Sequence, residues 1–359
     1  MKTFILLVVS AALSCTLTAQ NTVRMNAVKG NNFGVNYSLP KTSIKVTAEY
    51  TKTTLKAGQY YQYAERYLNI SNPIIENEVQ YTLDGLTAET EGVIDSQNSY
   101  QVEFRANTTA PYVTLTEDGL ICAINSDYDF VPNVKQTAVQ ESKNEAILNP
   151  NTFLSEEILR AGSTAKQAEL IAKQIYRLRE SRTNILTGEA DNMPPDGAAY
   201  ELVMNQLDAQ EKALVAMFIG TKTTEKGLRT FTVIPDKQDI EREILFRFSS
   251  KLGVVEPNDL SGAPVYISLT NKEPRVEQEL TEKEAKEMEK KFSKGIVYNV
   301  PGKGMLKISY NNKAFVNKEC DIVQYGIQDV LAPNMFDNNK RPIKVIFYPK
   351  LGAIQQIIQ

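Results

Sequence analysis

The hydrophobic pattern of the chain changes period twice, and this restricts its possible folds more than any other feature. From Phe33 to about Phe130 apolar and polar residues alternate in segments such as Ile44–Tyr50, which is typical of half-buried strands. In the middle of the chain apolar residues recur three or four positions apart, as on one face of a helix. Strand patterns return after Leu228, for example in Val265–Leu269. We therefore expect an α+β fold, with two β-rich, sandwich-like regions and helices between them.

The helices between the β-rich regions have visible ends in the sequence. Ser155 can cap a helix, and Glu156 and Glu157 follow in its first turn, where the helix dipole favours acidic side chains. Two apolar stripes then follow, joined by a loop over residues 183–197: Ala168, Ile171, Ile175 and Leu178 form the first, and Val203, Leu207, Leu214 and Phe218 the second. Two amphipathic helices with one connection predict an antiparallel helical hairpin.

Residues 1–19 have the layout of a secretory signal peptide. Lys2 is positively charged, Phe4–Leu13 form a short apolar run, and Thr18 and Ala19 are small or polar residues suited to a cleavage site. Cleavage after Ala19 is expected, and lipidation of Cys15 is the alternative, since Ala12–Cys15 loosely resembles a lipoprotein signal. The protein is expected to be exported, to the periplasm, the outer membrane or the cell exterior. No later segment has the unbroken apolar stretch of a transmembrane helix.

The expected organisation is a signal peptide over residues 1–19 and three further parts. These are an N-terminal β-rich domain over 20–145, the helical hairpin over 146–225 and a C-terminal β-rich domain over 226–359. The pattern leaves open whether the two β-rich regions form one core or two.

The composition excludes several kinds of chemistry. The 359 residues include no histidine, so Ser-His-Asp and Cys-His catalysis and histidine-containing zinc sites are impossible. Carboxylates, lysine, tyrosine or an oxygen-ligated metal remain possible. The formal net charge is −3, and acidic and basic residues are interspersed along the chain. The sequence therefore has no basic stripe of the kind that binds nucleic acid. Apart from Cys15 the chain has Cys122 and Cys320, which could form a disulfide in an oxidising compartment or be two separately buried thiols.

Two groups of residues are weak candidates for a binding site. Tyr60 and Tyr63 belong to a tyrosine-rich segment with helical spacing, which could present an aromatic patch to a glycan or peptide or could pack one face on a core. Asp191 and Asp196 lie in a loop whose oxygen side chains suit calcium or a binding partner. The loop does not have the spacing of an EF-hand, and Asp196-Gly197 is better explained as a helix cap and turn.

Two motifs resemble catalytic sequences only superficially. Ser163-Thr164-Ala165-Lys166 has the S-x-x-K spacing of penicillin-binding enzymes, but the S-D-N and K-T-G elements that accompany it are absent. Pro301-Gly302-Lys303-Gly304 lacks the spacing of a phosphate-binding loop and is expected to be a hairpin turn.

Several separate segments resemble an exported Bacteroidota family known only as a domain of unknown function, the 4831 family. The segments are Tyr37–Thr42, Gly58–Leu68, Ile175–Glu180, Leu186–Asp191, Gln324–Gly326 and Tyr348–Ala353. The resemblance implies a location in the cell envelope or outside the cell, and no activity or site. With no catalytic constellation and no cofactor motif in the sequence, the expected function is a non-enzymatic binding or structural module that contacts protein or surface glycan. The alternative is a carboxylate-based hydrolase such as a glycosidase, whose Asp and Glu would meet only in the fold.

Overall fold

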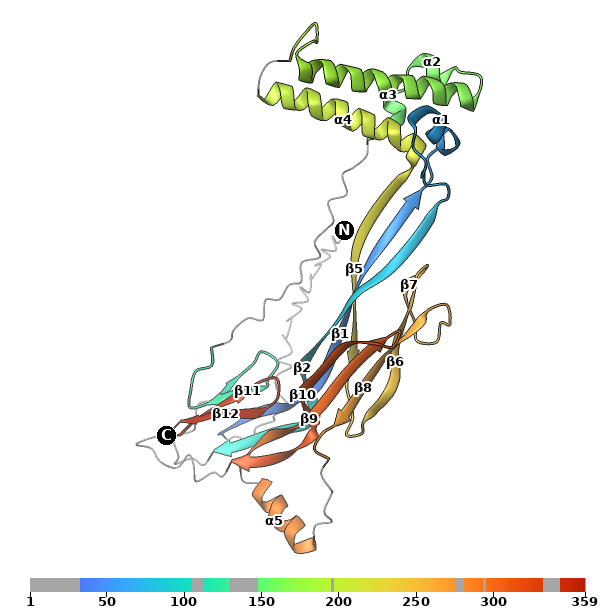
Figure 1. Ribbon diagram of the computed structural model, residues 1–359. Coiled ribbons are helices and arrows are strands. Elements are labelled where there is room, and N and C mark those ends of the chain that lie inside the picture. Colours follow the sequence, from blue (N-terminus) through green and yellow to red (C-terminus); the bar gives the residue numbers. More distant parts are fainter. Residues whose placement is uncertain are drawn as a thin grey trace, which may run out of the picture.

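The computed structural model describes residues 33–104, 113–129, 148–194, 197–274, 281–292, 295–331 and 343–358. The expected signal peptide, including Cys15, lies outside these residues. The fold is α+β, as predicted: three sheets with antiparallel strand pairing form the lower part of the molecule in Figure 1, and a group of helices lies at its upper end. In the described part of the chain, no helix has both the length and the hydrophobicity needed to cross a bilayer.

The strands form sheets of three, five and four strands. The first has the order β2-β1-β5, from Glu78–Phe104, Phe33–Lys56 and Thr221–Val233. The second has the order β10-β9-β8-β6-β7, from Lys313–Leu331, Ile296–Tyr310, Ala263–Asn271, Ile240–Ser249 and Gly253–Val255. The third has the order β12-β11-β4-β3, from Ala353–Ile358, Lys344–Tyr348, Ile121–Ile124 and Val113–Leu115.

Strands from the two β-rich regions of the sequence pair with each other. β1 lies between β2 and β5, with Ile44 opposite Val233. β4 likewise pairs with β11, where Ile124 lies opposite Val345. Segments that the helices separate in sequence therefore share two of the three sheets.

The sheets enclose two adjoining apolar clusters, which we call the body. Ile44, Val46 and Ala48 alternate along β1, so they point to one face and pack against the second sheet. At the other end of β1, Tyr37 and Leu39 belong to a cluster that includes residues of the third sheet. The predicted sandwich-like packing is thus present, with β1 common to both clusters.

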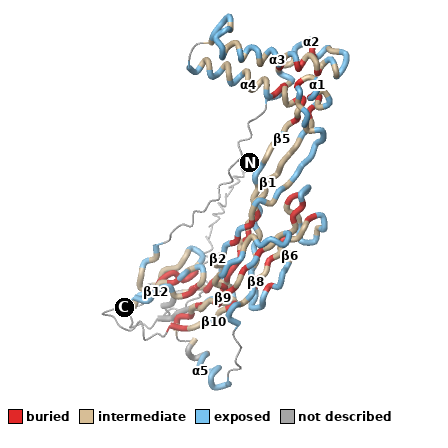
Figure 2. The backbone as a smooth tube through the Cα atoms, in the orientation of Figure 1, coloured by how far each residue is buried: buried red, intermediate tan, exposed pale blue. Residues whose placement is uncertain are grey.

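Beyond Ala48, β1 contains no buried residue until the chain reaches Gly58. We call this exposed three-stranded segment the arm; it comprises Thr51–Lys56 of β1, Glu78–Thr82 of β2 and Thr221–Lys226 of β5. Strands of this length span about 20 Å. Figure 2 shows buried residues in the body and among the helices, and intermediate or exposed residues along the arm. The arm therefore separates two apolar cores.

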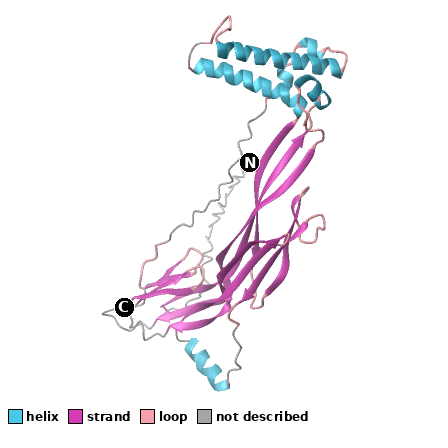
Figure 3. Cartoon of the chain, viewed as in Figure 1, coloured by secondary structure: helices cyan, strands magenta, loops and turns pink. Residues whose placement is uncertain are grey.

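The helices at the end of the arm form the head (Figure 3). They are η1 (Tyr61–Tyr63), α1 (Ala64–Leu68), η2 (Pro150–Phe153), α2 (Glu156–Leu159), α3 (Thr164–Thr187) and α4 (Ala198–Ile219). α3 and α4 form the predicted hairpin. Its first boundary was predicted wrongly, because Ser155 precedes only the short helix α2 and the long helix begins after Ser163. α3 also extends to Thr187, so the connecting loop is shorter than expected.

Two glycines allow the head to pack closely on the end of the arm. A Cβ atom on Gly58 would lie 2.6 Å from the carbonyl oxygen of Met217, and one on Gly220 would lie 2.3 Å from that of Lys56. Gly220 also has a φ of +82°, which L side chains rarely adopt. The amide of Tyr60 donates to Met217 O at 2.7 Å across the same contact. The sequence thus fixes the head to the arm through backbone packing.

The predicted hairpin turn at Pro301–Gly304 is wrong, because β9 continues through these residues. The glycines have a different function there. A Cβ atom on Gly302 would lie 2.5 Å from the carbonyl oxygen of Tyr325, so the residue allows β10 to approach closely. Opposite this point the pairing of β10 with β9 shifts register between Ile322 and Ile327.

Helix α5 (Glu282–Phe292) lies below the body in Figure 1. The predicted capping box is present: the amide of Thr281 donates to Glu284 Oε2 at 2.9 Å, and the amide of Glu284 donates to Thr281 Oγ1 at 3.4 Å. The hydrogen bonds that the Glu284 carboxylate accepts from the hydroxyl and the amide of Thr281 lower its pKa. The residues from Thr281 to Met288 are exposed, in agreement with a surface helix.

Candidate binding site

A group of partly buried hydrogen bonds connects β1 to the irregular part of β10. The amide of Thr42 donates to Gln324 Oε1 at 3.0 Å, and Gln324 Nε2 donates back to Thr42 O at 2.8 Å. The amide of Val323 donates to Thr42 Oγ1 at 2.9 Å. Gln324 and Val323 lie where β10 loses its regular pairing with β9. The irregularity thus supplies the polar groups that hold β1.

Asn299 extends these hydrogen bonds to the turn after β11. Its side chain is 2% exposed, and its Nδ2 donates to Pro40 O at 3.1 Å and to Leu351 O at 2.9 Å. Its backbone amide donates to Gly352 O at 2.9 Å, and Gly352 N closes the turn on Tyr348 O at 2.8 Å. We call this set, Thr42, Asn299, Gln324 and the turn Tyr348–Gly352, the junction. It fixes one β1 segment and one turn to the second sheet.

A pocket of about 420 Å³ lies beside the junction. The turn forms one wall and rests directly on β2, since a Cβ atom on Gly92 would lie 2.4 Å from Lys350 O. The pocket is lined by residues from five separate parts of the chain: Thr42, Thr90, Glu91, Tyr128, Lys318, Glu319, Cys320, Asp321, Tyr348, Pro349, Lys350 and Leu351. Its volume is within the usual range for small-molecule sites.

Each carboxylate that lines the pocket forms an ion pair with a lysine. The pairs are Glu91–Lys45, Glu319–Lys272 and Asp321–Lys303, with N–O distances of 3.5, 3.0 and 2.6 Å. The hydrogen bond with Asp321 raises the pKa of Lys303. All three carboxylates of the lining are therefore held by a neighbouring lysine.

Cys122 and Cys320 are separate free thiols in the structure. Cys122 is buried in β4, donates to Leu120 O at 3.6 Å, and has a pKa raised by burial to about 11. Cys320 lines the pocket and donates to Gly304 O at 3.7 Å, and burial raises its pKa too. A raised pKa keeps a thiol protonated and unreactive near neutral pH.

The tyrosine-rich segment is part of the core of the head. Tyr60 is 3% exposed, lies 5.8 Å from the ring of Phe218, and donates its hydroxyl hydrogen to Gln167 Oε1 at 3.1 Å. Burial raises its pKa. Tyr63 stacks on Tyr67 at 6.0 Å and packs at the edge of the same core. The structure therefore places both candidate tyrosines in packing positions, away from the pocket.

Only one of the two candidate aspartates lies in the described part of the chain. Asp191 is exposed in the loop between α3 and α4, and Asp196 lies outside the described residues. Among the residues that the structure describes, no three His, Cys, Asp or Glu side chains form a group that could hold a metal ion.

Ser163 and Lys166 form the first turn of α3. Ser163 Oγ accepts a hydrogen bond from the amide of Lys166 at 3.3 Å, which is the geometry of a helix N-cap. The ammonium of Lys166 lies 3.1 Å from Glu169 Oε2, on the exposed side of the helix. The serine hydroxyl and the lysine amine are thus engaged in separate local contacts.

We expect Ser163→Ala to lower the free energy of unfolding of the head by about 1 kcal/mol, because it removes this cap. Chemical denaturation followed by circular dichroism would measure the change. Ser163→Asp is the matched control, since aspartate also caps helices and should restore most of the stability. Equal destabilisation by both variants would show that the hydroxyl has another role.

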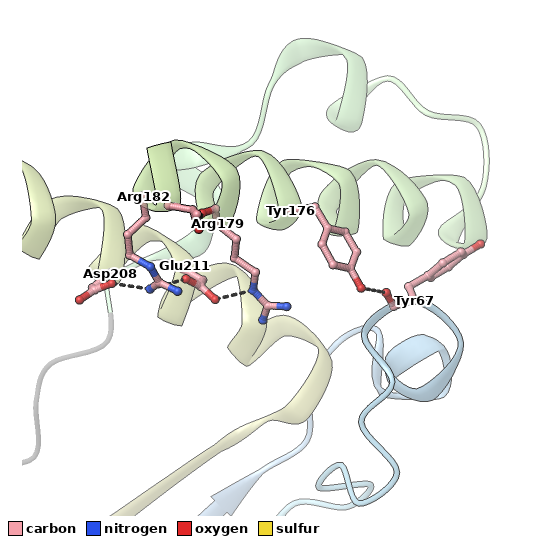
Figure 4. Close-up of polar contacts among 7 residues, drawn as sticks. Tyr67, Tyr176, Arg179, Arg182, Asp208 and Glu211 are labelled. Carbon is pink, nitrogen blue, oxygen red and sulfur yellow. Dashed lines mark hydrogen bonds and ion pairs between the residues drawn. The ribbon is translucent and has the colours of Figure 1, made fainter. Parts of the chain in front are cut away.

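The hairpin is held together by ion pairs beyond the core of the head (Figure 4). Arg179 Nε lies 2.7 Å from Glu211 Oε1, and Arg182 Nη1 lies 2.6 Å from Asp208 Oδ1 and 2.8 Å from Glu211 Oε2. Tyr176 donates its hydroxyl hydrogen to Tyr67 O at 2.9 Å, which links α3 to α1. Farther out, Leu202 is 69% exposed and borders a shallow hollow with Val203, Gln206 and Leu207.

The segments that carry the family resemblance meet at two places. Thr42, Gln324 and the turn Tyr348–Gly352 form the junction, and Tyr67 and Tyr176 join in the head. No curated protein and no solved structure matches the chain. A family model, by contrast, matches nearly all of the part that the structure describes. The chain belongs to the family described as Domain of unknown function (DUF4831), whose model matches residues 33–355.

Proposed function

We propose that the protein is an exported, non-enzymatic binding module of the cell envelope, and that its head contacts a partner protein. The observation that carries this proposal is the unequal burial of the hairpin. Every buried residue of α3 lies between Ala168 and Ile175, and every buried residue of α4 lies between Ala213 and Phe218. The outer half of the hairpin has no buried residue among those described.

The inner half of the hairpin is covered by a third layer. Tyr60, Ala64 and Leu68 pack on it from η1 and α1, and Ile158 packs on it from α2. The apolar stripe of α4 continues outward through Leu207 and Val203, which are only partly buried, and Leu202 beside them is 69% exposed. Two helices alone bury little apolar surface, and most helical stability in proteins comes from packing against further elements. A partner protein would supply the missing layer.

The ion pairs across the hairpin support this role. Arg179, Arg182, Asp208 and Glu211 connect α3 and α4 where the head has no core, so the outer half keeps its shape without a partner. A preformed surface loses less entropy on binding. Export is supported by the charged, apolar and small-residue segments of residues 1–19.

A carboxylate-based hydrolase is the second candidate, and the pocket beside the junction is the feature that favours it. Glu91, Glu319 and Asp321 all line that pocket. Each of these carboxylates forms an ion pair with a lysine, and the unequal burial of the hairpin makes binding the better supported function.

Affinity purification of the tagged full-length chain from its own cells tests the proposal. The variant Leu202→Asp with Leu207→Asp places charges at the hollow on the outer half of α4, and we expect it to lose a protein that the wild type retains. Leu260→Asp is the matched control, because Leu260 is 83% exposed in the loop before β8 and far from the head in sequence. Identical sets of recovered proteins from all three chains would contradict the proposal, as would glycan hydrolysis that Glu91→Gln abolishes.

A further inference from the structure

The pocket beside the junction has rigid walls. Thr42 is 1% exposed, and its backbone and side chain are held by Gln324 and Val323. The opposite wall is the turn containing Lys350, which rests on Gly92 and is tied to Asn299. A site whose polar groups are already fixed loses little entropy when a ligand binds. The pocket therefore has the preorganisation that a specific ligand site needs.

The charges around the pocket favour an anion. The three lining carboxylates are each neutralised by a lysine, as described above. Two further lysines, Lys318 and Lys350, line the pocket and form no ion pair with a carboxylate in the described part of the chain. Lys318 Nζ donates to the carbonyl oxygen of Ala88, which places its charge beside the β2 wall. Lys318 and Lys350 are thus the charged groups of the lining that have no carboxylate partner among the described residues.

The same pocket offers ring surfaces. Tyr128 and Tyr348 both line it. Burial raises the pKa of Tyr128, and Cys122 and Tyr348 raise it to smaller extents. The effect of Tyr348 agrees with a position of the two phenols near each other in the pocket. Tyr348 is 47% exposed and is followed by Pro349. Aromatic side chains present an apolar face with a polar hydroxyl at the edge, which matches the apolar face and hydroxyl rim of a sugar ring. A small inorganic anion has no surface that these rings could cover.

From these observations we infer that the pocket binds an acidic saccharide, a sugar ring that carries a carboxylate. Lys318 and Lys350 would pair with the carboxylate, and Tyr348 with Pro349 would contact the ring. The inference is independent of the protein contact proposed for the head, because the pocket is lined by residues of β1, β2, β10 and the turn after β11, whereas the hollow on the outer hairpin is lined by residues of α4.

Binding of the purified full-length chain to a glycan panel tests the inference. The panel pairs each uronic-acid or sialic-acid glycan with its neutral counterpart, and isothermal titration with the best acidic member and with inorganic phosphate gives affinities. We expect an acidic glycan to bind, its neutral counterpart to bind at least about ten-fold more weakly, and the affinity to fall with added salt. Phosphate alone should bind more weakly than the glycan.

Lys350→Gln should weaken binding about ten-fold or more, because it removes a charged hydrogen bond while leaving an exposed side chain of similar size. Lys318→Gln should act in the same direction, and the unfolding temperature of each variant verifies its fold. Lys251→Gln, at an exposed lysine in the turn between β6 and β7, is the control and should bind like the wild type. The inference would be overturned by a panel in which no acidic glycan binds, by equal binding of neutral counterparts, by equal binding of phosphate, or by unchanged binding to Lys350→Gln. The head variant Leu202→Asp with Leu207→Asp should bind glycan normally, so the two proposals fail separately.

Discussion

Phe218→Ala should lower the free energy of unfolding of the head by about 3–5 kcal/mol, the usual cost of removing a fully buried aromatic side chain. Phe218 is 0% exposed and lies at the centre of the head core, against Tyr60 and the buried face of α3. The cavity would be hard to close, because the glycine contacts at Gly58 and Gly220 fix α4 on the arm. Urea unfolding combined with amide hydrogen exchange would measure the effect on each part of the molecule.

The loss should be confined to the head, since the arm between the two cores contributes no buried residue. Amides of α3 and α4 should then exchange faster while those of β8 and β9 remain protected. Leu202→Ala is the matched control, because a side chain that is 69% exposed on the same helix should change stability by less than about 0.5 kcal/mol. Equal loss of protection in the body would show that the cores unfold as one unit.

Asn299→Ala should destabilise the body by about 2–4 kcal/mol, because it removes the donor to a buried carbonyl oxygen, of Pro40, and to a partly buried one, of Leu351. It should also loosen the turn that carries Lys350, so glycan affinity at the pocket should fall even where the variant is fully folded. Thermal unfolding and titration with the acidic glycan measure the two effects.

Asn317→Ala is the control for this variant. Asn317 is an exposed residue of β10, so its truncation should alter neither quantity appreciably. A full loss of stability in Asn299→Ala without any change in the affinity of the folded protein would show that the junction does not organise the pocket.

Local sequence patterns predicted most of the elements, because the period of the apolar residues is set within each segment. Ile44, Val46 and Ala48 alternate and lie in β1, and the stripes of Ile171 with Ile175 and of Leu214 with Phe218 form the buried faces of the hairpin. Errors arose where packing between segments decides the outcome. Ser155 and Ser163 are equally suitable caps, and the chain turns between them so that Ile158 can pack in the head core.

The pocket could not be found from the sequence, since its residues come from segments that no local pattern connects. Tyr60 and Tyr63 are neighbours in sequence, whereas Thr42, Lys318 and Lys350 come together only in the fold. Thr42 and Lys350 both belong to segments that carry the family resemblance, and this is the one feature of the sequence that connects them. The resemblance shows the order of these segments along the chain, but it does not show which of them are in contact.

The sequence by itself therefore determined which segments are strands and which are helices, and it excluded every chemistry that needs histidine. Tertiary structure alone decided that β1 pairs with β5 across the helical hairpin and that β4 pairs with β11. The physical reason is that strand pairing depends on backbone hydrogen bonds, which any exposed strand edge offers alike, and on the burial of faces by distant segments. Local patterns show that a face is apolar, and only the folded chain shows what covers it.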